Sequence, residues 1–465
     1  MKMGIPGSRS ATVAMAVLSA MLLVPVLLSP RVSAETGRPD WVVTSLTTLE
    51  DTIKQLDSNL VVGSGGELRL INSTLILNGS KEGGLRIVVE QGGKLTGDRA
   101  NITWSRTNWH YWFLVNGTLD LRDCTVRGVR GQFDTGGIYL SPSSSATISG
   151  CRFADNQWYS IIANGTSPSI TDCAFEAVKA GIRVENGGAP TISGNTITGA
   201  ERQAIIALNS APVISNNRMI GGHQGIDLDR SKAQISGNEI SGCQAWGIQC
   251  YDFSDATITG NAITGCAEEG ISVVASAPAI LSNVITGNGI GVNTSASSAT
   301  LTKNTIGGNR GWGVFCRSGA PALSGNTFTD SRGTGNAMGD VAVVWSLTVL
   351  VEEERRGPVS GANISITDSS GESVFKGTTG DDGTAAGIEL YQYKIESGTR
   401  HSSTPHKVSV SKGGLSSSSS ITMDRDQTIT AKLVKRSTGF IPGLDAVWIA
   451  VAGVFAVAFV CRKRD

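Results

Sequence analysis

The chain has 465 residues, of which 58 are glycine and only 13 proline, and aromatic residues make up 6%. Lys+Arg and Asp+Glu both total 39, which argues against a nucleic-acid-binding protein because such proteins carry a basic excess. A mean hydropathy of +0.01 excludes a polytopic membrane protein. The length suffices for two or three domains.

The N-terminus has the pattern of a secretory signal. Lys2 and Arg9 precede an apolar run over 11–28, and Val-Ser-Ala follows at 32–34. This order of charge, apolar run and small residues predicts a signal peptide over residues 1–34, cleaved after Ala34. An uncleaved N-terminal anchor is the alternative.

The C-terminus has the pattern of a membrane anchor. An apolar run over 446–461 is followed by Arg-Lys-Arg at 462–464. Extended to residue 441, the run approaches the roughly 20 residues that a span needs. We therefore expect a transmembrane or sorting segment over 441–461 and a cytoplasmic basic tail over 462–465, since basic residues flank the cytoplasmic side. The rest of the chain would lie on the extracellular face of the cell membrane.

Seven Asn-x-Ser/Thr sequons agree with an exterior location and are candidate glycosylation sites. They begin at Asn72, Asn78, Asn101, Asn116, Asn164, Asn293 and Asn363.

A short turn that ends in an apolar residue recurs along the chain at intervals of 21 to 29 residues. A fixed period of this size is typical of a solenoid. The apolar residues are Leu68, Leu95, Leu119, Ile148, Ile170, Ile192, Ile214, Ile235, Ile258, Ile280, Leu301 and Leu323. Each unit has three short strand-like pieces separated by Gly or Asn turns. The pattern predicts one coil of a parallel β-helix per unit, and coils stack about 4.8 Å apart.

The heptapeptides SGNTITG (193–199), SGNEISG (236–242) and TGNAITG (259–265), each followed by a strand such as GIDLD (225–229), carry a family resemblance. They resemble the right-handed parallel β-helix repeats of the NosD-like and pectate-lyase-like group, over about residues 45–335. The resemblance implies an all-β, right-handed parallel β-helix over 41–339. It implies no single function, because the group includes lyases, hydrolases, epimerases, binding proteins and accessory proteins.

The third position of the heptapeptide is asparagine on seven successive coils, and cysteine (Cys124, Cys151, Cys173) on the three before them. We expect these amides to form an interior ladder, in which each bonds the next amide and the turn backbone. The ladder residues are Asn195, Asn217, Asn238, Asn261, Asn283, Asn304 and Asn326. Small buried thiols are expected at the cysteine positions, and a Cys243–Cys266 disulfide is an alternative in an exterior compartment.

Residues that point outward from the Gly-Ile strand, or that precede it, would line one face of the rod. Acids, amides and aromatic residues on one face suit a glycan, because sugar rings stack on aromatic rings and hydroxyls bond polar groups. The candidate ligand-binding residues are Tyr159, Arg183, Glu185, Asp227, Asp229, Trp246, Tyr251, Glu269, Trp312 and Arg317.

The alternative is a polysaccharide lyase or hydrolase that acts on extracellular glycans. It would use Asp227 and Asp229 with His223 or Arg230, as acid and base or through Ca²⁺. Asp227 and Asp229 are the only close pair of acids on that face, so we lean towards a protein that is not an enzyme, with no cofactor expected and Ca²⁺ possible. The NosD resemblance implies a third role, as an accessory factor in metalloprotein maturation. The chain has only four histidines, none at ligand spacing within a coil, and we expect no metal site.

After Asp330 the repeat ends, and alternating strands with Gly and Asp turns predict a small β-sandwich over 340–436. The order GPVSGA, ITDSSGE, GTTGDDGTA resembles carboxypeptidase-regulatory-like modules. The serines at 416–420 predict a flexible loop. Pro-Gly-Leu at 442–444 resembles an archaeal C-terminal sorting signal, with Leu444 in place of the usual Phe. The sequence thus indicates a tethered surface protein whose partner is a polysaccharide or a cell-surface glycoprotein, with no nucleic acid involved.

Overall fold

The computed structural model describes residues 39–79, 84–105, 109–130, 136–330, 333–354 and 356–435. The predicted signal peptide (1–34), membrane segment (441–461) and basic tail (462–465) lie outside these residues. Within the described ranges the chain is all-β, and no helix there is long and apolar enough to cross a membrane.

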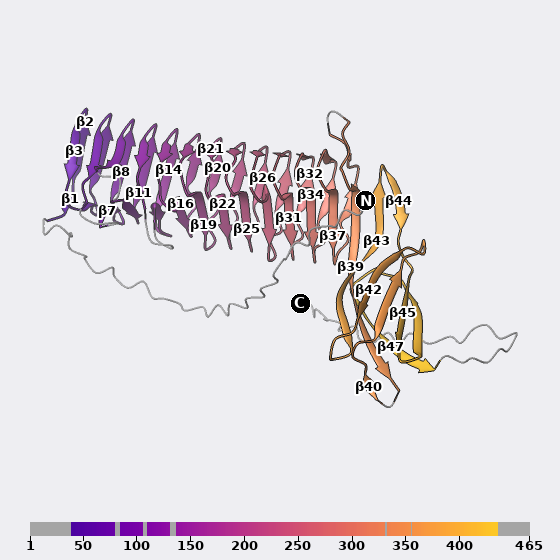
Figure 1. Cartoon of the computed structure of the whole chain (residues 1–465). Helices are drawn as coiled ribbons and strands as arrows, with labels where there is room; N and C mark the ends of the chain where they lie inside the picture. The colour runs from indigo at the N-terminus through magenta and orange to yellow at the C-terminus, as the bar shows by residue number, and fades with distance from the viewer. Residues whose placement is uncertain are drawn as a thin grey trace, which may run out of the picture.

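The described chain forms a rod of about 12 stacked coils, with a second β-unit at its C-terminal end (Figure 1). Each coil contributes one strand to each of three parallel sheets, and each strand pairs with its equivalents on the coils before and after it. Backbone groups inside the rod are thereby paired, and open strand edges are confined to its ends.

The strands of the first sheet within the rod begin at the N-terminal end. They are β1 (Trp41–Val43), β4 (Leu60–Val62), β7 (Leu85–Val89), β10 (Tyr111–Val115), β13 (Ile138–Leu140), β16 (Tyr159–Asn164), β19 (Ala180–Glu185), β22 (Gln203–Leu208), β25 (Gln224–Asp229), β28 (Ile248–Tyr251), β31 (Glu269–Val274), β34 (Ile290–Ser295), β37 (Trp312–Arg317) and β39 (Gly339–Glu353).

The second sheet follows the same order along the rod. Its strands are β2 (Leu46–Glu50), β5 (Glu67–Ile71), β8 (Lys94–Asp98), β11 (Thr118–Arg122), β14 (Ser145–Ser149), β17 (Ser169–Thr171), β20 (Thr191–Ser193), β23 (Val213–Ser215), β26 (Gln234–Ser236), β29 (Thr257–Thr259), β32 (Ala279–Leu281), β35 (Thr300–Thr302) and β38 (Ala322–Ser324).

The third sheet completes each coil. Its strands are β3 (Ile53–Leu56), β6 (Thr74–Leu77), β9 (Asn101–Trp104), β12 (Thr125–Arg127), β15 (Arg152–Ala154), β18 (Ala174–Glu176), β21 (Thr196–Thr198), β24 (Arg218–Ile220), β27 (Glu239–Ser241), β30 (Ala262–Thr264), β33 (Val284–Thr286) and β36 (Thr305–Gly307).

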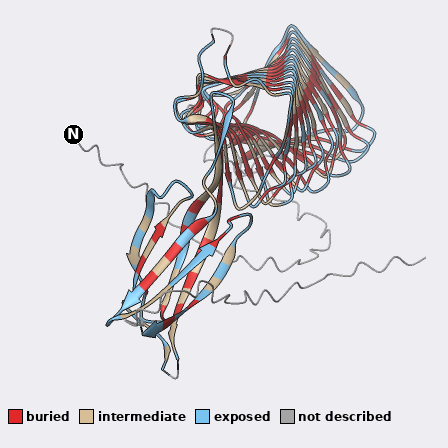
Figure 2. Ribbon diagram, turned by 90° about the vertical axis from the view of Figure 1, so that its right-hand side faces the viewer, coloured by how far each residue is buried: buried red, intermediate tan, exposed pale blue. Residues whose placement is uncertain are grey.

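Alternation within these short strands builds the core. Ile192, Ile197 and Ile205 of one coil all point inward and are at most 1% exposed, and their equivalents stack above and below them. Buried residues recur at equivalent positions of successive coils, as Figure 2 shows, and their side chains form the core of the rod. This alternation is what a half-buried strand of period two requires.

The predicted asparagine ladder is confirmed. Asn195 is fully buried, and both its backbone N–H and its Nδ2 donate to the Oδ1 of Asn217, each at 2.9 Å. Its Nδ2 also donates to the carbonyl of Ile170 at 3.0 Å. Cys173 precedes the first rung and donates its backbone N–H to the Oδ1 of Asn195. The pattern repeats down to Asn326, so the amide next to each buried isoleucine is fully hydrogen-bonded.

Two further ladders run along the rod. Backbone N–H groups of one coil donate to the Oγ of Ser231, Ser254 and Ser276 on the next. At another turn, Asn288 donates its backbone N–H to the Oδ1 of Asn309. These ladders fix the turns in the same way as the first, because a buried side-chain oxygen on one coil accepts a backbone N–H of the adjacent coil.

The seven described cysteines are buried free thiols. Cys243 and Cys266 lie on successive coils and their thiols are hydrogen-bonded to each other, which raises the pKa of Cys243 and lowers that of Cys266. The structure therefore holds this pair as thiols in contact, without the disulfide considered from the sequence.

The second unit shares a strand with the rod. β39 begins as the last strand of the first sheet, where Val314 of β37 pairs with Val341, and continues into the second unit. The boundary expected between residues 339 and 340 thus lies inside one strand. β43 (Thr384–Glu396) pairs antiparallel with β39 from Val341 to Leu350 and so covers the end of the sheet.

The other strands of the second unit surround a separate core that includes Leu347, Ile366 and Val408. They are β40 (Gly357–Pro358), β41 (Asn363–Thr367), β42 (Ser373–Thr378), β44 (Thr399–Ser402), β45 (His406–Lys412), β46 (Leu415–Ile421) and β47 (Gln427–Lys435). The loop predicted at 416–420 is wrong: these serines lie in β46, which pairs antiparallel with β45. The backbone hydrogen bonds of this pairing outweigh the weak strand propensity of serine.

Candidate functional site

The candidate site lies on the outer surface of the first sheet, between β19 and β28. Cross-strand pairing aligns Arg183, Ile206 and Asp227 in one row. A second row holds Glu185, Leu208, Asp229 and Tyr251. We call this surface the Asp227 face, and define it by Arg183, Glu185, Gln203, Gln224, Asp227, Asp229, Trp246 and Tyr251.

Asp227 lies at the centre of the face and is partly buried. Burial raises the pKa of its carboxyl group to about 6, and the neighbouring Asp229 carboxylate adds to the increase. Gln203 opposes it by donating its Nε2 to the Oδ2 of Asp227 at 3.4 Å. Burial also raises the pKa of Asp229. The Asp227 carboxyl group, with a pKa of about 6, changes its charge near pH 6.

Four buried polar side-chain atoms on this face have no hydrogen-bond partner among the described residues. They are the Oε1 of Gln203, the Oε1 of Gln224, the Oδ1 of Asp229 and the Nε1 of Trp246. A buried polar atom without a partner costs about 1–3 kcal/mol. Because these atoms are buried, side chains on this face must shift before a partner outside the chain can complete their hydrogen bonds.

An ion pair borders the face on the side of the N-terminal coils. Arg183 Nη2 lies 2.6 Å from Glu185 Oε2, and both side chains are largely buried. The Arg183 guanidinium also lies over the Tyr159 ring, 5.6 Å from its centroid. At the opposite border, Arg230 lies between two carboxylates, 3.1 Å from Asp229 and 3.6 Å from Asp252.

Two predicted ligand-binding residues do not lie on an open surface. Tyr159 is 6% exposed and packs with Ile162 and Ala180. Trp312 is 5% exposed, because it lies against Gly339 and the Tyr391 ring of the second unit. Both residues were expected just before the Gly-Ile strand as ligand-binding candidates, and the structure buries them there under neighbouring side chains.

The other candidates lie further along or at the edge of the same sheet. Glu269 accepts a hydrogen bond of 2.9 Å from Asn293 Nδ2, and burial raises its pKa. Arg317 forms an ion pair of 2.5 Å with Glu389 of β43. His223 is exposed in the turn before β25. None of the seven sequon asparagines is buried, which is compatible with glycosylation. The seven glycosylation sites stay predictions.

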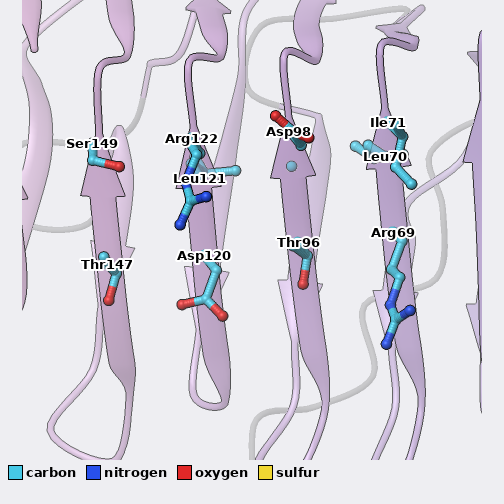
Figure 3. Close-up of a pocket in the computed structure, with 11 residues that line it drawn as sticks. Arg69, Leu70, Ile71, Thr96, Asp98, Asp120, Leu121, Arg122, Thr147 and Ser149 are labelled. Carbon is cyan, nitrogen blue, oxygen red and sulfur yellow. The ribbon is translucent and has the colours of Figure 1, made fainter.

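A shallow groove of about 500 Å³ lies elsewhere, on the second sheet between β5 and β14 (Figure 3). Pairing places Thr96 between Arg69 and Asp120 along its floor. The Oγ1 of Thr96 and the Oδ1 of Asp98 are buried without partners within the described chain. This groove was not predicted from the sequence, although charged and hydroxyl residues recur there at one repeat position.

The described residues contain no group of three or more His, Cys, Asp or Glu side chains arranged to hold a metal ion.

The comparisons with known proteins address the fold. Residues 136–285 and 180–328 match the family model described as a right handed beta helix region. The rod is a right-handed β-helix. No match was found among curated proteins.

The β-helix is also similar to solved structures of the periplasmic alginate epimerase AlgG. A mutant of this epimerase has a TM-score of 0.53 at 16% identity, over 59% of this chain and 78% of the epimerase chain. A double mutant has a TM-score of 0.50 at 16% identity, over 63% and 75% of the two chains. At this identity the similarity concerns the fold of the β-helix.

Some members of the Asp227 face were not predicted. Gln203 and Gln224 carry two of the four unpartnered atoms. Gln224 was expected to border this face but was not chosen as a ligand-binding residue, and Gln203 was not expected there. Their repeat position just before the Gly-Ile strand was the available signal, because Trp246 and Glu269 share it.

Proposed function

We propose that the protein binds polysaccharide on the Asp227 face of its β-helix, at the outside of the cell. The observation that carries this proposal is the set of four unpartnered polar atoms from Gln203, Gln224, Asp229 and Trp246. The set offers three acceptors and one donor, and either amide can turn to present its N–H₂ group instead. Sugar hydroxyls both donate and accept, so they suit such a set.

The shape of the surface supports an extended ligand. Equivalent positions on successive coils lie about 4.8 Å apart, so a row of them forms a long, regular surface. The epimerase that shares the fold acts, by its name, on alginate, which is a polysaccharide. Trp246 and Tyr251 add aromatic area beside the polar groups, as sugar-binding surfaces usually do.

The remaining parts of the proposal concern location. A secretory signal at 1–34 and a C-terminal segment at 441–461 would tether the chain to the membrane, with β39–β47 as a sandwich-like stalk beneath the β-helix. The polysaccharide face would then lie away from the membrane, and the partner would be a polysaccharide or the glycan of a surface glycoprotein.

Binding of the purified full chain to a panel of soluble polysaccharides tests the proposal. Trp246→Phe keeps an aromatic ring but removes the Nε1 donor, so we expect it to weaken binding by several-fold. Binding to no polysaccharide, or identical affinities for the wild type and Trp246→Phe, would count against the proposed site.

Catalysis is the second candidate function, and the raised pKa of Asp227 favours it. A carboxyl group with a pKa of about 6 exchanges a proton readily near neutral pH, as a general acid or base must. Incubation with polysaccharides followed by assays for new reducing ends, unsaturated products and epimerised residues would detect this activity. Products that form with the wild type and disappear with Asp227→Asn would establish an enzyme.

A further inference from the structure

The turn that follows β28 exposes a large aromatic side chain. Phe253 is 70% exposed, and Tyr251, at the end of β28, is 49% exposed. Tyr251 pairs with Asp229 of the Asp227 face. The two aromatic residues therefore lie where the chain leaves that face.

The backbone at Phe253 is strained. Phe253 has φ of 63°, directly after Asp252 with φ of 49°. Bulky residues rarely adopt the left-handed conformation, which costs roughly 1–2 kcal/mol per residue. An exposed phenylalanine in this conformation incurs that strain and also exposes apolar surface.

Comparison with the same turn on other coils shows what Phe253 adds. In most of these turns one left-handed residue is followed at once by the serine of the ladder, as in Arg230–Ser231 and Ala275–Ser276. After β28 an extra residue, Phe253, stands between Asp252 and Ser254. The turn after β19 also has an extra left-handed residue, and there it is Gly187 with φ of 84°, as sterics favour.

The neighbouring coil holds this turn in place. Phe253 donates its backbone N–H to the carbonyl of Ala275 at 2.9 Å, just as Gly187 donates to Asn209 at 2.8 Å. Ser254 is fully buried, and donates its backbone N–H to Ser276 and its Oγ to the carbonyl of Tyr251. Strained conformations persist where the surroundings fix them, and they gather at functional sites.

We propose that Phe253 and Tyr251 form an aromatic platform that receives the apolar face of a pyranose ring. This inference rests on the proposed polysaccharide function and extends its site by one residue that the sequence analysis did not select. The exposed ring of Phe253, carried on a backbone that the neighbouring coil fixes, offers apolar area to a ligand.

The charges around the platform favour a neutral sugar. Acids outnumber bases on β25, β28 and β31 and their adjoining turns, with Asp227, Asp229, Asp252, Asp255, Glu268 and Glu269 against Arg230 and Lys232. Arg230 is already engaged by Asp229 and Asp252. A polyanion would meet like charges here, and this repulsion discriminates against it.

The test combines affinity and stability measurements on the full chain. The probes are soluble glucan, galactomannan and polygalacturonate. We expect the wild type to bind a neutral polymer more tightly than polygalacturonate, and Phe253→Gly to weaken that binding about tenfold. Because glycine suits the left-handed conformation, Phe253→Gly should keep or raise the Tm. Phe253→Trp should retain affinity.

The outcomes separate the platform from the proposed function. A wild type that binds neutral glycan with a Phe253→Gly variant of equal affinity would overturn the platform and leave the function standing. A Tm that falls together with affinity would assign Phe253 a structural role and overturn the platform. A preference for polygalacturonate would overturn the inference that the ligand is a neutral sugar. A wild type that binds no polysaccharide would overturn both proposals.

Discussion

Asn195 and Asn217 lie on successive coils, and the Nδ2 of Asn195 donates a hydrogen bond of 2.9 Å to the Oδ1 of Asn217. The same oxygen accepts the backbone N–H of Asn195 at 2.9 Å. The Oδ1 of Asn217 thus accepts hydrogen bonds from both the side chain and the backbone of Asn195. This relationship explains why a polar residue can recur next to buried apolar residues along the ladder, since each amide hydrogen-bonds to the amide on the next coil.

Removing a central rung should destabilise the rod. Asn261 donates to Ile235, Thr259 and Asn283, and its Oδ1 accepts two hydrogen bonds from Asn238. Asn261→Ala leaves the backbone N–H of Asn238 without its acceptor and removes a donor from the carbonyl of Ile235, so we expect a loss of about 3 kcal/mol in the free energy of unfolding. Urea denaturation measures it.

Thr198→Ala, at an exposed strand position, is the matched control and should change stability by less than about 0.5 kcal/mol. Equal stability of Asn261→Ala and the control would show that the ladder contributes nothing. Polysaccharide binding should survive Asn261→Ala at temperatures where the variant is folded, because Asn261 lies inside the rod.

The raised pKa of Asp227 predicts a pH-dependent stability. Its pKa of about 6 in the folded chain lies above the value of about 3.9 in the unfolded chain. Protonation therefore favours the folded state, and this contribution is present below about pH 4 and is lost as the pH rises through 6.

Asp227→Asn removes this titration. Relative to the wild type, the variant should gain up to about 3 kcal/mol between pH 4 and pH 8. Chemical denaturation across this range measures the gain. The difference between the variant and the wild type cancels the contribution of the other acidic residues to the pH dependence. A difference that does not vary with pH would contradict the burial of Asp227.

A guanidinium group ties three coils together. Arg310 donates from Nη2 to the carbonyls of Cys266 and Ala267 at 3.0 and 2.9 Å, and from Nη1 to the carbonyl of Gly287 at 3.2 Å. Arg310→Ala should lower the free energy of unfolding by about 1 kcal/mol, since these hydrogen bonds are partly exposed to solvent. Arg310→Lys should recover only part of the loss, because an ammonium group lacks the planar fork. Full recovery with lysine would contradict the forked contact.

Arg317 serves the junction between the β-helix and the second unit. It pairs with Glu389 at 2.5 Å, and the neighbouring Ser318 donates to Asp426 at 3.0 Å. Because the Arg317 and Glu389 side chains are about half exposed, Arg317→Ala should cost under 1 kcal/mol. We also expect polysaccharide affinity to stay unchanged, which a titration would check. A large loss of affinity would return Arg317 to the binding site.

The coils and the ladder could be predicted from the sequence because both depend on local repetition. One apolar residue per 21 to 29 positions and one amide per coil fix the three sheets and the direction of each side chain. The burial of Trp312 could not be predicted, since it depends on Gly339 and Tyr391, which a later segment brings into contact.

The candidate site was predicted in part for the same reason. The outward rows through Asp227 and Asp229 follow from the period, and the structure brings them together with Trp246 and Tyr251. The unpartnered atoms of Gln203 and Gln224 depend on how side chains of adjacent coils cover one another. The strand at 415–421 was missed because its serines take their structure from pairing with β45.

Polysaccharide binding to the Asp227 face can be tested by the affinities of variants that alter this face. Gln203→Ala/Gln224→Ala removes two of the four unpartnered atoms, while Arg69→Ala/Arg122→Ala alters the groove on the second sheet as a control. With the polysaccharide that the full chain binds best, we predict that the first pair weakens affinity at least about tenfold and the second leaves it unchanged. Unchanged affinity for the first pair, or a loss confined to the groove variant, would show that polysaccharide does not bind the Asp227 face.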